Sequence, residues 1–162
     1  MILETLDLNG TAFQVRKAQT ADLHALIELM TNDPVRQAET STPTASLDAY
    51  KAAFQAIDSD PAQLLVAVTD QDETVVATMQ LTTIPGLARA GATRMQIEAV
   101  RVAQSQRGIG IGSAMITWAV DHARQQGIDL VQLTSDNQRS DARRFYEHLG
   151  FTASHTGFKL KL

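Results

Sequence analysis

The segment that most constrains the fold is a glycine-rich junction between a strand-like run and a helix-like run. The run "RMQIEAVRV" (94–102) is rich in apolar and β-branched residues, which favours a strand. It is followed by "QRGIGIG" and then by residues 112–126, where small and apolar residues recur at helical spacing and Gly127 marks a stop. A further strand-like run, "DLVQLTS", covers 129–135. Two strands joined through a helix are parallel, so this unit predicts one parallel pair.

The chain before this unit predicts strands joined by hairpins and two helices. Asn9-Gly10 supplies the positive φ values of a two-residue turn, so residues 6–15 predict a hairpin. Helical spacing of apolar residues predicts helices over 20–30 and from about 47 to 57. Strands are expected over 63–69 and 74–84, and the segment "PGLARAGAT" that follows is expected to be a loop.

The C-terminal part predicts one more helix and two short strands. Ser140 or Asp141 is a candidate N-cap, and Gly150 ends the helix. The tail "FTASHTGFKLKL" is expected to hold the two strands. Since hairpin-joined strands are antiparallel, the expected fold class is α/β (α+β), a mixed and mostly antiparallel sheet with helices on both faces. A length of 162 residues suits a single domain over 1–162.

Charge and composition exclude several classes of function. A net charge of −4 argues against nucleic acid, because phosphate backbones attract basic surfaces. The absence of cysteine excludes disulfides and thiolate metal sites, and no two histidines have metal-ligand spacing, so no metal is expected. No apolar run reaches the length of a membrane helix, and the first residues lack the features of a signal peptide. A soluble cytoplasmic protein is therefore expected.

The three glycines of the junction predict an anion site. Gly108, Gly110 and Gly112 allow a tight turn, and the first N–H groups of the following helix have no partner within the helix. They lie at the positive end of the helix dipole, which suits a phosphate. A P-loop would need Lys-Ser/Thr after the last glycine, and a dinucleotide-binding motif would need glycine at position 113. This chain has Ser113-Ala114 there, so it matches neither motif. A plain flexible loop and a module for another nucleotide remain alternatives.

Two motifs in this chain resemble those of the GNAT superfamily of acetyl-CoA-dependent N-acetyltransferases. "RGIGIG" (107–112) resembles the family segment R/Q-x-x-G-x-G/A, and "ARRFYEHLGF" (142–151) is similar to A-x-x-F-Y-e-x-L-G-F. The start, "VRKAQTADLHALIELM", is similar to the family's first strand and helix, so the resemblance covers nearly the whole chain. It implies a GNAT-like sheet whose parallel pair is splayed.

The resemblance implies that acetyl-CoA is the cosubstrate and assigns residues to it. The pyrophosphate would lie on the glycine loop, and the pantetheine would pair with the strand near Val100. Many members have Asn where this chain has Arg139, and either Asn137 or Ser140 would take over that contact. The expected acetyl-CoA-binding residues are Val100, Arg101, Val102, Arg107, Gly108, Ile109, Gly110, Ile111, Gly112, Ser113 and Asn137.

The resemblance also implies two proton-transfer residues. Glu98, just before the acetyl position, is the candidate base, acting directly or through a water. Tyr146 matches the family's tyrosine and would protonate or hydrogen-bond the leaving thiolate. The alternatives are a surface carboxylate for Glu98 and a core aromatic for Tyr146. If the strand alternates regularly, Glu98 shares a side with Gln96, Val100 and Val102.

The expected function is transfer of an acetyl group to a primary amine of a small molecule or peptide, by direct attack in a ternary complex. A non-catalytic CoA-binding sensor on the same fold is the alternative. Acidic residues outnumber basic ones over 20–60, which would attract a cationic amine or only solvate two helices. Arg89 and Arg94 could bind an acceptor carboxylate or CoA phosphates. GNAT sheets often dimerise, so the resemblance also allows a homodimer.

Overall fold

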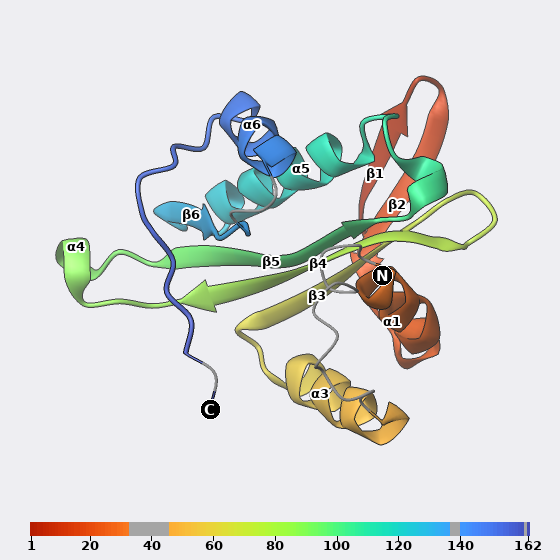
Figure 1. The fold of residues 1–162 in the computed structure, drawn as a ribbon, viewed down its shortest axis with the longest axis horizontal. Helices are drawn as coiled ribbons and strands as arrows, with labels where there is room; N and C mark the ends of the chain where they lie inside the picture. The colour runs from red at the N-terminus through yellow and green to blue at the C-terminus, as the bar shows by residue number, and fades with distance from the viewer. Residues whose placement is uncertain (33–45, 137–139, 161) are drawn as a thin grey trace.

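The sheet of this protein has six strands that lie in the same order as in the chain. The computed structural model describes residues 1–32, 46–136, 140–160 and 162. Neighbouring strands are antiparallel from β1 to β5, and β5 pairs with β6 in parallel (Figure 1). Helices lie on both faces (Figure 1). The predicted fold class and its single parallel pair are therefore confirmed.

The elements follow the predicted order closely up to the last helix. They are β1 (Ile2–Leu8), β2 (Thr11–Lys17), η1 (Thr20–Asp22), α1 (Leu23–Thr31), α3 (Leu47–Ser59), β3 (Gln63–Thr69), β4 (Val75–Ile84), α4 (Ala88–Gly91), β5 (Arg94–Val102), η2 (Gln104–Gln106), α5 (Ile111–Gln125), β6 (Leu130–Leu133) and α6 (Ser140–His148). The turn between β1 and β2 has φ of 56° at Asn9 and 82° at Gly10, as the Asn-Gly pair predicts.

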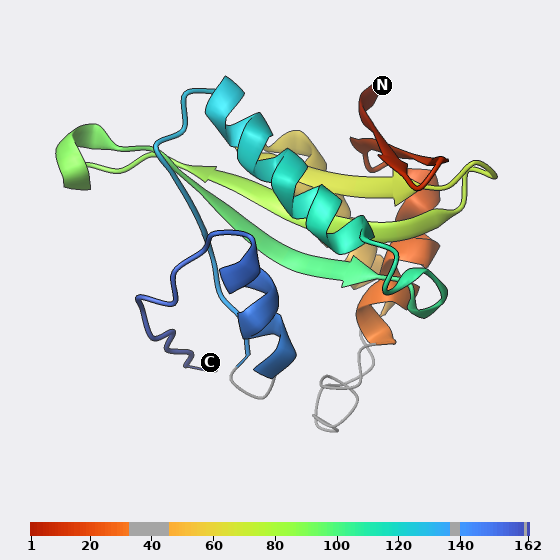
Figure 2. The same ribbon diagram turned by 90° about the horizontal axis from the view of Figure 1, so that it is seen from above.

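One face of the sheet is covered by α5 and α6 and carries the main core (Figures 1 and 2). Alternate residues of the strands point to this face, and Val66, Met79 and Ile97 are almost fully buried there. The helix α5 buries Met115 and Ile116 against them. Each such side chain stabilises the fold by roughly 1.5–3 kcal/mol, so this face holds α5 in place.

The opposite face is covered by α1 and α3 over only part of its width. A smaller cluster there joins Leu26 of α1 and Phe54 of α3 to Leu65 and Ala67 of β3. None of the described helices is long and apolar enough to cross a membrane.

Two expectations for the irregular segments are wrong. Within the described tail residues 151–160 and 162 there is no strand, and Phe158 and Leu160 are 93% and 87% exposed. The alternating pattern of this tail favours a strand, but a strand needs a neighbour to pair with. The expected loop between β4 and β5 contains the short α4, in which Arg89 and Ala90 have left-handed φ values of 55° and 58°.

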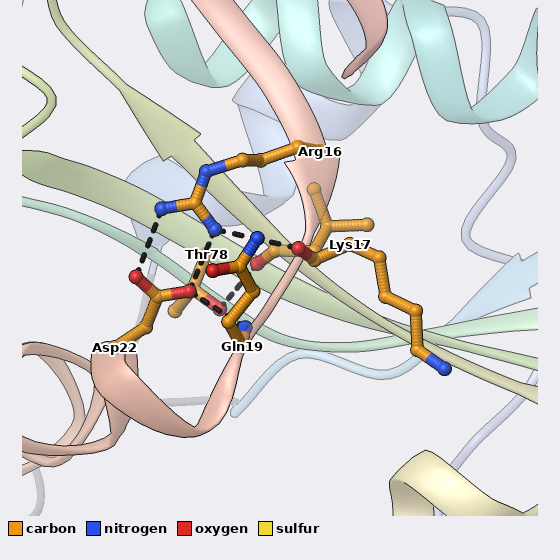
Figure 3. A network of polar contacts seen from close by, with 6 residues as sticks. Arg16, Lys17, Gln19, Asp22 and Thr78 are labelled. Atoms are coloured by element: carbon orange, nitrogen blue, oxygen red, sulfur yellow. Dashed lines mark hydrogen bonds and ion pairs between the residues drawn. The ribbon is translucent and has the colours of Figure 1, made fainter. Parts of the chain in front are cut away.

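A bidentate ion pair ties β2 to the start of α1 (Figure 3). The two guanidinium nitrogens of Arg16 donate to the two carboxylate oxygens of Asp22 at 2.6 and 2.8 Å. The same carboxylate accepts from the Gln19 N–H at 2.7 Å, which satisfies a free amide at the start of η1. Both charged side chains are largely buried, and the Arg16 hydrogen bond holds the pKa of Asp22 below its ordinary value.

We expect Asp22→Asn to lower the free energy of unfolding by about 2 kcal/mol at pH 7, because it leaves a largely buried guanidinium without its counter-charge. The lowered pKa means that the pair's contribution is complete above about pH 4 and is lost as the pH falls through the lowered value. Urea unfolding at several pH values checks both the loss and its disappearance in acid.

The matched control is Asp58→Asn, which removes the exposed Asp58 carboxylate from Lys17, 2.7 Å away. An exposed pair contributes about 1 kcal/mol or less, so this variant should stay close to the parent. An equal loss in both variants would contradict the role given to Asp22.

Candidate functional site

The glycine junction forms a sharp corner between the end of β5 and the start of α5 (Figure 2). Gly108 and Gly110 have φ of 84° and 99°, in the left-handed region that glycine adopts without strain. Gly112 differs from them, because a Cβ there would make an ordinary contact 3.5 Å from the ring of Phe145 in α6. The corner is thus shaped by glycine at two backbone positions.

The backbone amides of this corner are available to a ligand. The first bond of α5 runs from the Ala114 N–H to the Gly110 carbonyl. Within the described residues, no hydrogen bond uses the N–H groups of residues 108–113 as donors. Several unpaired donors at the positive end of a 15-residue helix suit a phosphate or diphosphate. The corner therefore has the donors that the predicted pyrophosphate site requires.

The strand β5 contains a β-bulge. Thr78 faces Arg101 and Gln80 faces Glu98, so two residues of β5, Ala99 and Val100, oppose one of β4. Ala99 has a left-handed φ of 52°. Sequence reasoning missed this feature, because alanine gives no signal of a left-handed position.

The bulge reverses the alternation of side chains along β5. Val100 and Val102 pack against the main core, on the same face as Ile97. The expectation from regular alternation, that Glu98 shares a side with Val100 and Val102, is therefore wrong. Glu98 stays on the opposite face with Gln96, and its side chain is exposed.

The parallel pair ends just before the bulge. The last paired residues of β5 and β6 are Ile97 and Leu133. From Glu98 onward, β5 pairs with β4 alone. The free edge of β5 therefore starts at Glu98 and runs toward the glycine corner, where an extended ligand could add to it as a strand does.

The helix α6 carries a group of aromatic side chains into the main core. Tyr146 is half-buried and its ring meets those of Phe145 and Phe151 edge to face, at centroid distances of 5.0 and 5.9 Å. Tyr146 packs against the same core as Val100. Its neighbour Phe145 lies close to Gly112, as does Val102 of β5.

The remaining predicted residues surround the corner or fall outside the described part of the chain. Arg101 donates to the Val100 carbonyl at 2.8 Å, and Arg107 donates to the Val102 carbonyl at 3.2 Å. Ile109 lines a hollow of about 280 Å³ beside the loop, and Ile111 is buried in the core. Ser113 lies in the first turn of α5. Asn137 lies outside the described residues, and Ser140 begins α6.

A larger hollow of about 460 Å³ lies at the other end of α5. It is lined by Lys17, Asp58 and His122 among others, and it contains none of the predicted site residues. Burial lowers the pKa of His122, so this imidazole is neutral at pH 7. Among the described residues, no group of three His, Asp or Glu side chains is arranged to hold a metal ion.

Comparison with known proteins gives the chain a family. The family model described as "Acetyltransferase (GNAT) family" matches residues 23–151. A solved structure described as a transcriptional regulator from Bacillus halodurans C-125 is 36% identical, with a TM-score of 0.85. That match covers 93% of this chain and 99% of the other.

Curated relatives match over shorter stretches. An aminoalkylphosphonate N-acetyltransferase of Salmonella typhimurium is 40% identical over 63 residues, which are 39% of this chain and 41% of that protein. A mycothiol acetyltransferase of Kocuria rhizophila is 35% identical over 97 residues, 59% of this chain and 32% of that protein. The chain thus spans less than half the length of these two relatives.

We expect Ala99→Val to lower the free energy of unfolding by about 1–2 kcal/mol. A β-branched side chain at a left-handed φ clashes with its own backbone, whereas alanine is tolerated at moderate cost. Ala99→Gly removes the clash but loosens the unfolded chain, so it should change stability by less than about 1 kcal/mol. Urea unfolding of the two variants checks that Ala99→Gly is more stable than Ala99→Val. If the two variants are equally stable, residue 99 does not have the left-handed conformation of the bulge.

Proposed function

The chain belongs to the acetyltransferase (GNAT) family, and from this premise we propose that it transfers the acetyl group of acetyl-CoA to a primary amine of a small molecule or peptide. The observation that carries the proposal is the set of unpaired amides over residues 108–113, next to the free edge of β5. Together, the amides would hold the diphosphate and the free edge of β5 would hold the extended pantetheine arm, which would then run along the strand toward Glu98. Acetyl-CoA would supply an activated thioester at the end of that arm.

The residues around the separated strands have distinct roles in this proposal. The amides of Gly108 to Ser113 bind the pyrophosphate, and the strand from Val100 to Val102 aligns the pantetheine. The Val100 N–H donates to the acetyl oxygen as negative charge develops there. Asn137, which the sequence predicts to contact the arm, lies outside the described residues.

In the proposed reaction, removing a proton from the acceptor amine is harder than protonating the leaving thiolate. An alkylamine with a pKa near 10.4 must lose a proton, which costs roughly 4–5 kcal/mol at pH 7. Glu98 takes this proton, directly or through a water, as the amine nitrogen bonds to the acetyl carbon. The carbon–sulfur bond then breaks, and Tyr146 gives or shares its proton with the departing sulfur.

A second candidate function is favoured by one comparison. The solved structure described as a transcriptional regulator matches this chain over nearly its full length. A non-catalytic module that binds CoA and regulates a partner would use the same glycine corner. Such a module has no need of a carboxylate beside the free edge, whereas Glu98 is exposed there.

A thiol-release assay with acetyl-CoA and a panel of amines tests the proposal. Turnover of any amine supports the enzyme. CoA binding by calorimetry without turnover of any amine would support the regulatory module instead.

We expect Glu98→Gln to lower kcat/KM for the amine by about a hundredfold at pH 7, with CoA affinity unchanged. The deficit should shrink as the pH rises toward 10, because more of the amine is already neutral. Tyr146→Phe should cost no more than about thirtyfold, since a thiol of pKa near 8.5 needs little help to leave at pH 7. A deficit in Glu98→Gln that is constant with pH would exclude a base.

We expect Gly110→Ala to weaken CoA binding by at least tenfold, measured by calorimetry. A side chain at φ 99° strains the corner and redirects the amides. The control is Gly157→Ala, where φ is not positive and a Cβ would make an ordinary contact 3.8 Å from Thr134. If CoA binds Gly110→Ala as tightly as the parent, the corner is not the diphosphate site.

A further inference from the structure

The sheet carries a continuous row of polar side chains across its last four strands. Gln63 of β3 faces Thr82 of β4, Thr82 faces Gln96 of β5, and Gln96 faces Gln132 of β6. Residues that face each other across a sheet point to the same side. With strands about 4.8 Å apart, these four positions span roughly 14 Å. We name these four residues the glutamine row.

The glutamine row points away from the main core. Met95, Ile97 and Leu81 beside it are buried on the α5 face, so their neighbours in the strands point to the other face. That is the face of α1 and α3, whose apolar cluster takes Leu65, Ala67 and Val75 from the sheet. The four residues of the row are only half-buried.

Hydrogen bonds hold the row in shape while leaving it accessible. Gln63 Oε1 accepts from Gln80 Nε2 at 2.9 Å and from Thr82 Oγ1 at 2.8 Å. Gln96 Oε1 accepts from Gln132 Nε2 at 2.8 Å. The four side chains of the row and that of Gln80 are half-buried, so solvent still reaches them. Amides ordered in this way form a pre-arranged surface of donors and acceptors.

Polar residues at these positions are unusual for a sheet. The pair β5–β6 is parallel, and parallel strands are generally apolar on both faces. Here Gln96 and Gln132 occupy the second face instead. The row also runs beside the proposed base, because Gln96 is two residues from Glu98, or about 6.6 Å along the strand. Gln80, bonded to the row, faces Glu98 directly.

We infer that the glutamine row is the floor on which the acceptor lies, and that it selects an amine whose carbon skeleton carries hydroxyl or other uncharged hydrogen-bonding groups. This inference rests on the proposed function, which places the amine at Glu98. Carboxamides and a hydroxyl both donate and accept hydrogen bonds, so they match hydroxyl groups in either sense. They also carry no charge with which to hold an anion or a second cation.

A charged acceptor would have to reach beyond the row. Arg94 is the next residue of β5 on this face, roughly 13 Å from Glu98 by strand spacing, and its guanidinium lies against Gly86. An amine with an anionic group close to its nitrogen would meet the amides first. The preference for an uncharged skeleton therefore concerns the part of the acceptor next to the amine.

The test compares matched amines at saturating acetyl-CoA by thiol release. Glucosamine and cyclohexylamine share a six-membered ring, and 3-amino-1-propanol and butylamine share a chain length. The anionic probe is 3-aminopropylphosphonate. We expect each hydroxylated amine to exceed its apolar partner at least tenfold in kcat/KM. Gln96→Leu and Gln132→Leu should each reduce this ratio three- to tenfold, through KM and not kcat, as loss of one hydrogen bond predicts.

The control is Gln55→Leu, the same change on the exposed surface of α3, which should keep the parent ratio. Thermal melting checks that the variants fold. If only one of Gln96→Leu and Gln132→Leu folds, that variant alone is compared with the parent. Equal rates for the matched amines, a preference for the phosphonate, or unchanged ratios in both row variants overturn the inference and leave acetyl transfer standing. Turnover of no amine at all overturns the proposed function together with the inference.

Discussion

The site depends on one backbone constraint, the left-handed residue Ala99 in the middle of β5. Regular alternation would keep Val100 and Val102 on the face of Glu98, outside the core. The extra residue returns both valines to the core and leaves Glu98 exposed on the other side. It also coincides with the end of the β5–β6 pairing at Ile97, so that β5 gains a free edge. A bulge costs ladder hydrogen bonds, and here the core contacts of the two valines offset that loss.

The two faces of the sheet differ in chemistry because they are covered differently. The face under α5 and α6 is apolar from Phe13 of β2 to Leu133 of β6, and this continuous core fixes the position of α5 and its glycine corner. On the other face, the apolar cluster of the described residues lies under α1 and α3, and the glutamine row begins where that cluster ends. Packing on one face therefore holds the anion corner rigid, while the second face remains free to present polar groups.

Much of the fold could be predicted from the sequence, and the reasons are local. Asn9-Gly10 has few conformations other than the observed turn, and Gly108 and Gly110 mark the corner with backbone requirements that few other residues meet. The bulge could not be predicted, because it follows from packing Val100 and Val102 into a tertiary core and Ala99 carries no local signal. The prediction of strands in the tail was wrong for the opposite reason, because a local signal was present without tertiary support. The segment "FKLKL" has a strand-like pattern but no neighbouring strand to pair with among the described residues. The four polar residues at 63, 82, 96 and 132 could not be grouped from the sequence, because their alignment into one row depends on the register of four strands.

In our proposal, backbone amides recognise the cosubstrate and side chains recognise the acceptor, so sequence similarity reports on the two unequally. In our proposal the backbone amides of the corner recognise the diphosphate, so any sequence that keeps the glycines keeps that ability. The same proposal assigns acceptor choice to side chains such as Gln96 and Gln132, which hydrogen-bond to each other on the polar face of the sheet. Two relatives with comparable identity to this chain carry names with different acceptors, an aminoalkylphosphonate and a mycothiol acetyltransferase. In our proposal, relatives can therefore share the corner and the fold while the polar face of the sheet sets which amine each of them accepts.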